Sequence, residues 1–314
     1  MSFVSLGELF PSSKMPAVVS DSAFLLDKFR ASGFHTLSID DVCNGKVTAP
    51  PEVLLIPALP AKHPVDGLSE ALGEAAVLLV PLLAFAHDNK SITYLHDRLQ
   101  ALDFSAACVK NNRMVEHIQH MGEGMRVDSS GCRLEIELGE NVDVFAPKLK
   151  PKIHFDEWIS IIQFFEIGLV PGEDYESFNV TGTLHCNGIS VAHHLHSHFD
   201  SGPPAQEVWS LLAERYSNGE FPLVLEVEES KMTRILTRQG KDILPEILPY
   251  TDKMMRGNLT EVGFGALEPS DDVDWLINSQ LNEPAGGIHL ALGAGEEAAH
   301  IDFISPYARI AGFS

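Results

Sequence analysis

The spacing of apolar residues changes near Met121, and this change restricts the possible folds more than any other feature of the chain. Before it, "MPAVVSD" at residues 15–21 has the pattern of a strand. The next segment, "SAFLLDKFRASG", has helical spacing, with Phe24, Leu25 and Phe29 on one side. The alternation continues through the strand candidates "FHTLSID" and "PEVLLIPALP" and a helix in "SITYLHDRLQAL". The sequence therefore predicts an α/β domain over residues 1–120.

After Met121 the strand signals dominate. The segment "MRVDSSGCRLEIELG" alternates apolar and polar residues around Ser129-Ser130-Gly131, which predicts a hairpin. Further strand-like runs follow, namely "SFNVTGTLHCNGISV", "PLVLEVEESKMTRIL", "EVGFGAL", "GGIHLALG" and "AHIDFISP". Two helices, at residues 204–216 and 241–248, are expected between them. Residues 121–314 are therefore predicted to form a β-rich α+β domain.

The chain is strongly acidic, with 44 Asp and Glu residues against 22 Lys and Arg and a formal net charge of -22. Such a surface repels phosphates and anionic lipids, so we expect no nucleic acid and no membrane as partners. The longest apolar run, "AAVLLVPLLAFA" at residues 75–86, is too short to span a bilayer and fits either a buried strand or a buried helix. Four scattered cysteines and the absence of a secretory signal predict a cytoplasmic protein.

The triplet His300-Ile301-Asp302 is the first candidate for a functional site. Residues two apart on a strand emerge on the same face, so the imidazole and the carboxylate could hold one divalent ion together with a third ligand. Glu261 is the expected third ligand, and His289 is a fourth ligand or a donor beside the ion. A mixed set of this kind suits iron, zinc or manganese. The alternative is a His–Asp hydrogen bond in a core without any metal.

Two further features of the sequence contain polar residues of interest. Three alternating histidines, His194, His196 and His198, lie in a histidine-rich stretch and are expected to form a solvated strand edge rather than a metal site. In "VPGEDYESF", Pro171-Gly172 predicts a turn with Glu173 at its edge. No G-x-S-x-G elbow, dinucleotide fingerprint or phosphate loop occurs, so covalent serine chemistry and nucleotide binding are not supported.

Three stretches resemble, in the same order, motifs of the metalloenzyme superfamily that contains the thermophilic aminopeptidases and the ring-cleaving dihydroxypyridine dioxygenase. They are "LVPGEDYESFNVTGTLHCNG", "NLTEVGFGALEP" and "GGIHLALGAG" followed by "HIDF". The resemblance implies an α/β domain facing a β-rich domain, and a homodimer. It also implies that Glu261, His300 and Asp302 hold one Fe, Zn or Mn ion. His289 and Glu173 would then take catalytic roles, with Glu173 at the Glu of the "P-x-GE" motif.

The chain also departs from the pattern of that superfamily. Only "GAGEEAA" separates the two histidine motifs, and Leu267-Glu268 stands where the superfamily has an Asn. Three hypotheses follow. The protein is a dioxygenase- or aminopeptidase-like enzyme with one metal, acting on a peptide or an amino-acid-derived small molecule in an interdomain cleft. Alternatively, it is a catalytically silent peptide-binding protein that assists modification of a ribosomal peptide natural product. In the third hypothesis, the H-x-D pair is purely structural.

Overall fold

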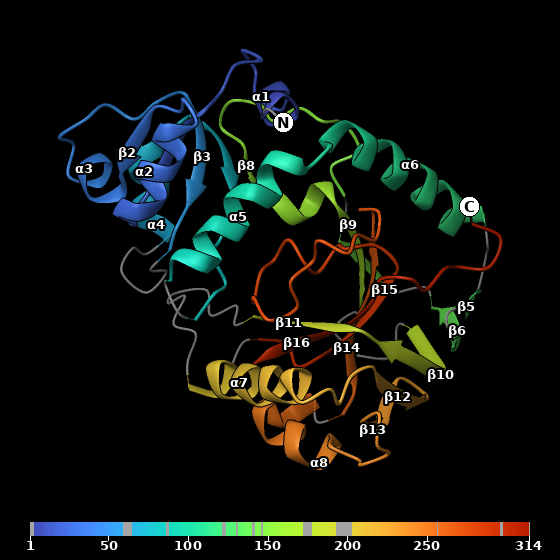
Figure 1. Ribbon diagram of the computed structural model, residues 1–314. Helices are drawn as coiled ribbons and strands as arrows, with labels where there is room; N and C mark the ends of the chain where they lie inside the picture. The colour runs from blue at the N-terminus through green and yellow to red at the C-terminus, as the bar shows by residue number, and fades with distance from the viewer. Residues whose placement is uncertain are drawn as a thin grey trace.

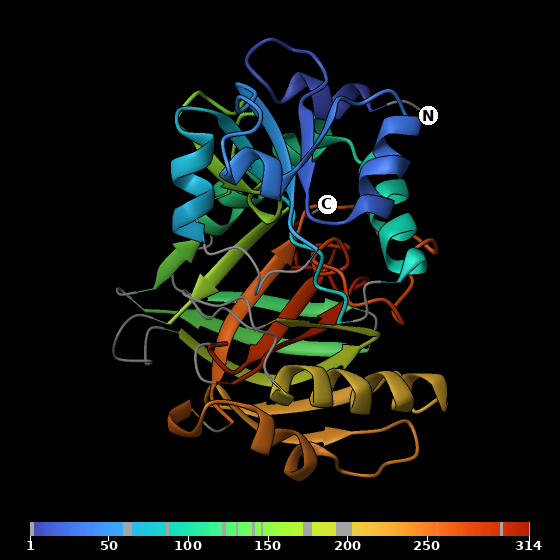
Figure 2. The same cartoon turned by 90° about the vertical axis from the view of Figure 1, so that its left-hand side faces the viewer.

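A computed structural model describes residues 3–58, 65–85, 88–120, 124–129, 131–139, 142–145, 147–171, 178–192, 203–255, 257–295 and 298–313. These residues form a mixed α and β structure with one parallel and two antiparallel sheets. Figures 1 and 2 show the parallel sheet and the helices α1 to α6 in the upper part of the molecule, above the antiparallel sheets. A mixed α and β class was predicted from the alternating patterns, and the structure confirms it.

The parallel sheet has five strands in the order β2-β1-β3-β4-β8. Their bounds are β1 Ala17–Ser20, β2 Thr36–Ser38, β3 Glu52–Ile56, β4 Ala76–Leu79 and β8 Trp158–Ser160. Every pairing within it is parallel. Both faces are covered, as is usual for parallel sheets. Along β3, Leu54 and Ile56 pack into one core cluster, and Val53 and Leu55 pack into a second cluster on the opposite face.

Helices cover the two faces of this sheet. The first cluster includes side chains of α2 (Ala23–Ala31), α5 (Asn89–Ala101) and α6 (Phe104–His120), whereas α3 (Ile39–Cys43) and α4 (Val65–Leu72) pack in the second. A short helix α1 (Val4–Glu8) also joins the first cluster. The predicted helix around Leu25 and Phe29 is confirmed as α2. Of the three residues expected on one side, Leu25 and Phe29 are buried, whereas the Phe24 side chain is 40% exposed and Leu26 is buried.

The chain returns to the parallel sheet after residue 120. β8 pairs with β4, and the 3-10 helix η2 (Ile161–Phe164) contributes Phe164 to the core cluster of α2 and α5. The division into domains 1–120 and 121–314 stays a prediction. Because β8 pairs with β4, residues of the segment 121–314 contribute a strand to the parallel sheet of the segment 1–120.

Two antiparallel sheets enclose the largest core cluster. One has the order β13-β12-β10-β6-β5, with bounds β5 Gly124–Ser129, β6 Cys132–Leu138, β10 Phe178–Cys186, β12 Leu223–Glu228 and β13 Lys231–Leu236. The other has the order β11-β16-β15-β14-β9-β7. Its bounds are β7 Asp143–Phe145, β9 Glu166–Val170, β11 Gly188–Ala192, β14 Leu259–Gly265, β15 Ile288–Leu292 and β16 His300–Ser305. The helices α7 (Pro203–Ser217) and α8 (Leu244–Ile247) pack at the lower end, where two 3-10 helices, η3 (Leu248–Tyr250) and η4 (Lys253–Met255), follow α8 (Figure 1).

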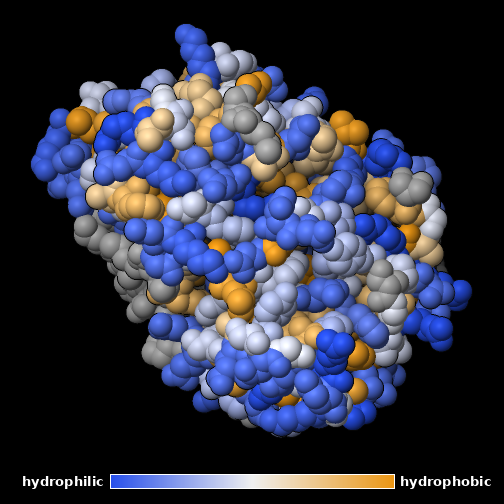
Figure 3. All heavy atoms as spheres, viewed as in Figure 1, coloured by the Kyte–Doolittle hydropathy of each residue, from blue (hydrophilic) through white to orange (hydrophobic). Residues whose placement is uncertain are grey.

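The visible surface is mainly hydrophilic. On the face shown in Figure 3, hydrophilic residues predominate and apolar residues gather only in small scattered groups. Within the described part of the chain, none of the helices has the length and apolar character needed to cross a bilayer.

Candidate metal centre

One face of the six-stranded sheet carries a cluster of carboxylates and imidazoles. Cross-strand neighbours share a face, and Glu261 on β14 lies opposite Ala291 on β15, which lies opposite Asp302 on β16. In the same way, Gly263 lies opposite His289. The residues between them, such as Val262, Leu290 and Phe303, point to the opposite face and are buried in the core cluster shared with the other antiparallel sheet. Strand alternation therefore separates a polar face from an apolar face.

His300 is oriented by two contacts. Its Nδ1 lies 2.7 Å from the carbonyl oxygen of Gly293, and its Nε2 lies 2.9 Å from Oδ1 of Asp302. In the protonated ring Nε2 donates to Asp302, whereas in the neutral ring a proton on Nδ1, donated to the Gly293 carbonyl, leaves the lone pair of Nε2 available for an ion. Metal-binding histidines are oriented in this way by a carbonyl or carboxylate behind the ring.

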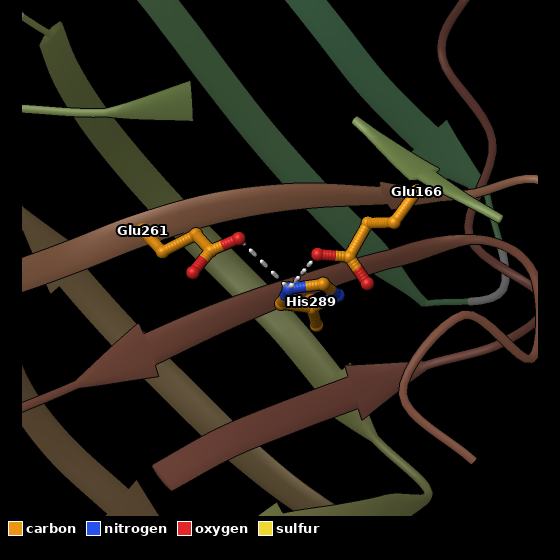
Figure 4. A group of neighbouring side chains, drawn as sticks. All are labelled: Glu166, Glu261 and His289. Carbon is orange, nitrogen blue, oxygen red and sulfur yellow. Dashed lines mark ion pairs between the residues drawn. The ribbon is translucent and has the colours of Figure 1, made fainter. Parts of the chain in front are cut away.

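Glu261 and Glu166 lie on either side of His289 (Figure 4). Nε2 of His289 is 3.6 Å from Oε1 of Glu166 and 3.6 Å from Oε1 of Glu261, and it is 4.0 Å from Oδ1 of Asp302. The other oxygen of Glu261, Oε2, lies 3.6 Å from Nε2 of His300. These separations exceed a normal hydrogen bond. The carboxylate of Glu261 therefore lies between the two imidazoles with one oxygen directed to each.

Two of these buried atoms lack a hydrogen-bond partner. Within the described residues, Oε2 of Glu166 and Nε2 of His289 are buried and accept or donate no hydrogen bond. A buried polar atom without a partner is costly and calls for an explanation, such as an ion or a water molecule between the side chains. Side-chain ligand atoms lie within 4.8 Å of one another in three groups: Glu166, Glu261 and His289; Glu261, His300 and Asp302; and Glu283, His289 and Asp302. The residues thus fit a divalent ion with oxygen and imidazole ligands.

Glycines make the room that this cluster needs. A Cβ atom on Gly263 would lie 1.9 Å from Cε1 of His289, and a Cβ atom on Gly168 would lie 2.5 Å from Oε1 of Glu261. Any side chain at these positions would displace a residue of the cluster. The "E-x-G-x-G" stretch of β14 therefore has a physical basis, because Glu261 and Gly263 share one face and the glycine leaves space for the imidazole of the neighbouring strand.

Burial and mutual charge shift the pKa values of the cluster. Burial, and then the charge of Asp302, raises the pKa of Glu283 to about 8. Burial raises the pKa of Glu166 well above its ordinary value, with the nearby carboxylates adding to the effect. Burial opposes the charged form of His300, but Asp302 and Glu261 more than offset this and raise its pKa to about 10. Burial also disfavours ionisation of Glu261, yet the two histidines keep its pKa below its usual value. A bound divalent cation would neutralise carboxylates clustered in this way.

The structure brings together four of the five residues predicted from the sequence. Glu261, His289, His300 and Asp302 converge, and their roles as ligands or catalytic groups stay predictions. Glu173 lies outside the described residues. So do His194, His196 and His198, so the expectation of a solvated histidine edge stays a prediction.

Sequence reasoning missed two members of the cluster, Glu166 and Glu283. Glu166 carried a signal, because it is a charged residue inside the otherwise apolar run "FFEIGLVP". Glu283 precedes Pro284 in a segment between β14 and β15, and no pattern in the sequence indicated it. Its place beside His289 follows from tertiary structure alone.

Two solved structures are similar to this chain at low level. "Wild-type AmpT from Thermus thermophilus" has a TM-score of 0.48 and 11% sequence identity, over 92% of this chain and 87% of that chain. "Structure of 2,5-dihydroxypridine Dioxygenase from Pseudomonas putida KT2440" has a TM-score of 0.48 and 10% identity, over 96% and 88% of the two chains. No curated protein matches the sequence.

A family match covers nearly the whole chain. Residues 13–312 match the family described as "Crocagin biosynthetic protein CgnE/B". The match includes all three sheets and every residue of the carboxylate and histidine cluster. The chain therefore belongs to the crocagin biosynthetic protein CgnE/B family.

Proposed function

We propose that this protein binds a peptide intermediate and assists its modification during the biosynthesis of a ribosomal peptide natural product. The observation that carries the proposal is the family match over residues 13–312, whose description places its members in a biosynthetic pathway. It agrees with the expectation of a peptide-binding protein drawn from the sequence.

The outer strand β7 supplies an edge for an extended peptide. Asp143 and Val144 of this strand are exposed, with Val144 at 53%, and among the described residues β7 pairs only with β9. An extended peptide adds readily to such an edge through main-chain hydrogen bonds. β9 carries Glu166, and its Gly168 lies directly against the side chain of Glu261. A peptide paired with β7 would therefore extend the sheet that carries the cluster.

The opposite edge of the same sheet is capped at Val191 of β11. Asn278 accepts a hydrogen bond from the Val191 N–H at 3.0 Å and donates one to the Val191 carbonyl at 2.7 Å, so it takes the place of a neighbouring strand along β11. This asymmetry favours β7 over β11 as the edge for a peptide.

Selection from a library of random peptides displayed on phage with free C-termini tests the proposal. We expect the enriched sequences to share a motif, to be neutral or basic overall because the protein is strongly acidic, and to bind the purified protein in calorimetry. Val144→Lys should weaken binding, because a charge on an edge strand discourages strand addition. Val4→Lys, at a side chain that is 60% exposed on α1, is the matched control and should leave binding unchanged. A selection without enrichment would contradict the proposal. Enriched peptides that bind Val144→Lys as tightly as the natural sequence would contradict the assignment of β7 as the binding edge.

The resemblance also implied a homodimer, and we propose this assembly. Light scattering on the purified protein tests it, and a mass equal to that of one chain would refute it.

The cluster supports a second candidate function, that of a metal-dependent enzyme. Glu261, His300 and Asp302 would hold the ion, and a bound ion would supply polarisation of a carbonyl or activation of water or dioxygen. His289 lies between Glu166 and Glu261 and could carry a proton at Nε2.

Metal analysis separates the two functions. The protein would be reconstituted anaerobically with Fe(II), and separately with Zn(II) or Mn(II), and its metal content measured by mass spectrometry. The enzyme function predicts stoichiometric metal that is lost in His300→Ala and Glu261→Gln. If these variants bind no metal but bind the selected peptides as the natural sequence does, the peptide-binding function stands without the enzyme function.

A further inference from the structure

A pocket lies on the face of the six-stranded sheet that is opposite to the carboxylate and histidine cluster. It is lined by residues of α6, of the adjoining ends of β14 and β15, and of the segment that follows β16, namely Lys110, Met114, Phe264, Gly265, Glu268, Gly287, Ile288, Ala308, Arg309, Ile310 and Phe313. In Figure 1, α6 and the C-terminal end of the chain lie side by side at the upper right, and the 5.3 Å contact between the His117 and Phe313 rings joins them. Phe264 and Ile288 alternate with Gly263 and His289, so the pocket lies on the face away from the cluster.

The size and walls of the pocket fit one apolar side chain. Its volume is about 140 Å³. An apolar cavity of roughly this size accommodates one benzene ring. Met114, Phe264 and Ile288 belong to the large core cluster, and Phe313 packs against that cluster from its edge. The pocket is therefore an opening into the core, large enough for a Leu, Ile or Phe side chain but not for a cofactor.

Two cations line the same pocket. Nη1 of Arg309 donates to the carbonyl oxygens of Pro306 at 2.9 Å and Ala308 at 2.8 Å, which fixes the guanidinium in place. Among the described residues no salt bridge joins Arg309 to a carboxylate, but its charge, after the hydrogen bond from Lys110, helps to lower the pKa of Glu268. Nζ of Lys110 lies 2.8 Å from Oε1 of Glu268, but the Glu268 side chain is 80% exposed, so this pair is weak and open to exchange. Two positive charges thus face one solvated carboxylate, in a protein whose net charge is -22.

From these observations we infer that the pocket binds the C-terminal residue of a peptide, with its apolar side chain against Met114, Phe264 and Ile288 and its α-carboxylate at Arg309 and Lys110. An arginine held by backbone carbonyls still has N–H groups in the planar arrangement that matches a carboxylate. A free amino acid fits less well, because its ammonium group would lie beside two cations. The inference rests on the proposed peptide-binding function and assigns the end of the peptide that the protein recognises.

Small probes test the pocket apart from the whole peptide. N-acetyl-L-leucine and N-acetyl-L-leucinamide would be titrated separately into the isotope-labelled full-length protein and followed by heteronuclear NMR. We expect the acid to shift the backbone amides of Gly265, Gly287 and Phe313 in a saturable way, and the amide to bind at least about tenfold more weakly, since a charge-assisted hydrogen bond is lost. Equal binding of the two probes, or binding of neither, overturns the inference. Free leucine that binds as tightly as N-acetyl-L-leucine overturns the assignment to a peptide.

Three variants sharpen the test. Arg309→Gln should weaken the acid about fivefold or more while leaving the amide unaffected. Glu268→Gln removes the competing carboxylate from an exposed position and should strengthen binding of the acid about twofold or more. Arg126→Gln, an exposed arginine on β5, is the control and should change neither. Because the first two variants act in opposite directions, loss of folding cannot imitate the pattern. An unchanged affinity in Glu268→Gln contradicts the inference.

The two proposals fail in different ways. If the phage selection yields no peptide but N-acetyl-L-leucine still binds with the expected variant pattern, the proposed function fails. The assignment of the pocket at Arg309 and Lys110 as a site for a carboxylate then stands. If selected peptides bind but neither amidation of their C-terminus nor Arg309→Gln changes their affinity, the pocket assignment fails and the proposed function stands.

Discussion

Single residues set the geometry of the cluster, and Gly263 is the most sensitive of them. A methyl group at this position would overlap the ring of His289, which is only 1% exposed and has no room to move. We expect Gly263→Ala to lower the free energy of unfolding by about 1–3 kcal/mol, as overpacking does, and to reduce any metal binding. Denaturant unfolding measures the first effect and metal analysis the second.

Gly67→Ala is the matched control. Gly67 lies in α4, has open space around an added Cβ atom and is exposed, so alanine there should be neutral or stabilising by about 0.5–1 kcal/mol. If Gly263→Ala and Gly67→Ala have the same free energy of unfolding, steric overlap with His289 does not explain why residue 263 is a glycine.

Glu283 gives the metal-free protein a pH-dependent stability. Its pKa is raised from 4.5 to about 8 in the folded state, so the folded state holds the proton more tightly than the unfolded state. The resulting stabilisation is complete below pH 4.5 and is lost as the pH rises through about 8. The raised pKa of His300, about 10, acts in the same direction at higher pH.

We therefore expect the free energy of unfolding of chelator-treated protein to fall by about 1–3 kcal/mol between pH 5 and pH 8. Glu283→Gln, which cannot ionise, should flatten this slope. Denaturant unfolding at a series of pH values provides the measurement, and a slope that is the same in both proteins would show that Glu283 does not titrate in this range.

At the scale of elements, Asn278 closes the edge of β11. Its buried side chain bonds the N–H and the carbonyl of Val191 and also donates to the carbonyl of Leu83 at 3.2 Å. Asn278→Ala leaves buried backbone groups without partners and should cost about 2–4 kcal/mol. Asn179→Ala, on the exposed side of β10, should cost no more than about 0.5 kcal/mol. Thermal or denaturant unfolding compares the two, and equal losses would mean that β11 does not depend on this cap.

Strands were predicted from the sequence more completely than helices. Period-two alternation predicted the hairpin of β5 and β6, and the strand-like runs correspond to β10, β12, β13, β14, β15 and β16. The ambiguous run "AAVLLVPLLAFA" became β4, because a strand of the parallel sheet is buried on both faces and shows no alternation. The long helix α6 was missed. Its buried residues include Phe104, Cys108 and the polar Asn111, whose side chain donates a hydrogen bond to the carbonyl of Phe164.

At the scale of the whole molecule, charge opposes compactness. A net charge of -22 implies self-repulsion, which added salt screens as the Debye length falls from about 30 Å at 0.01 M to about 8 Å at 0.15 M. We expect the melting temperature to rise by about 1–3 °C over this range of NaCl. KCl should act equally, since screening does not depend on the cation. A fall in melting temperature would show that ion pairs such as Arg215 with Glu220 outweigh the repulsion.

The local pattern of the chain was enough to state which side chains share a face. His300 and Asp302 had to emerge together because strand residues alternate, and this needed no knowledge of the neighbouring strands. The position of Glu166 beside Glu261 and His289 depended on strand order and register, which join segments far apart in the chain. Alternation is a property of two successive residues. Strand pairing is a competition among long-range contacts that one sequence does not display, so the full cluster and the pocket beneath α6 emerged only in three dimensions.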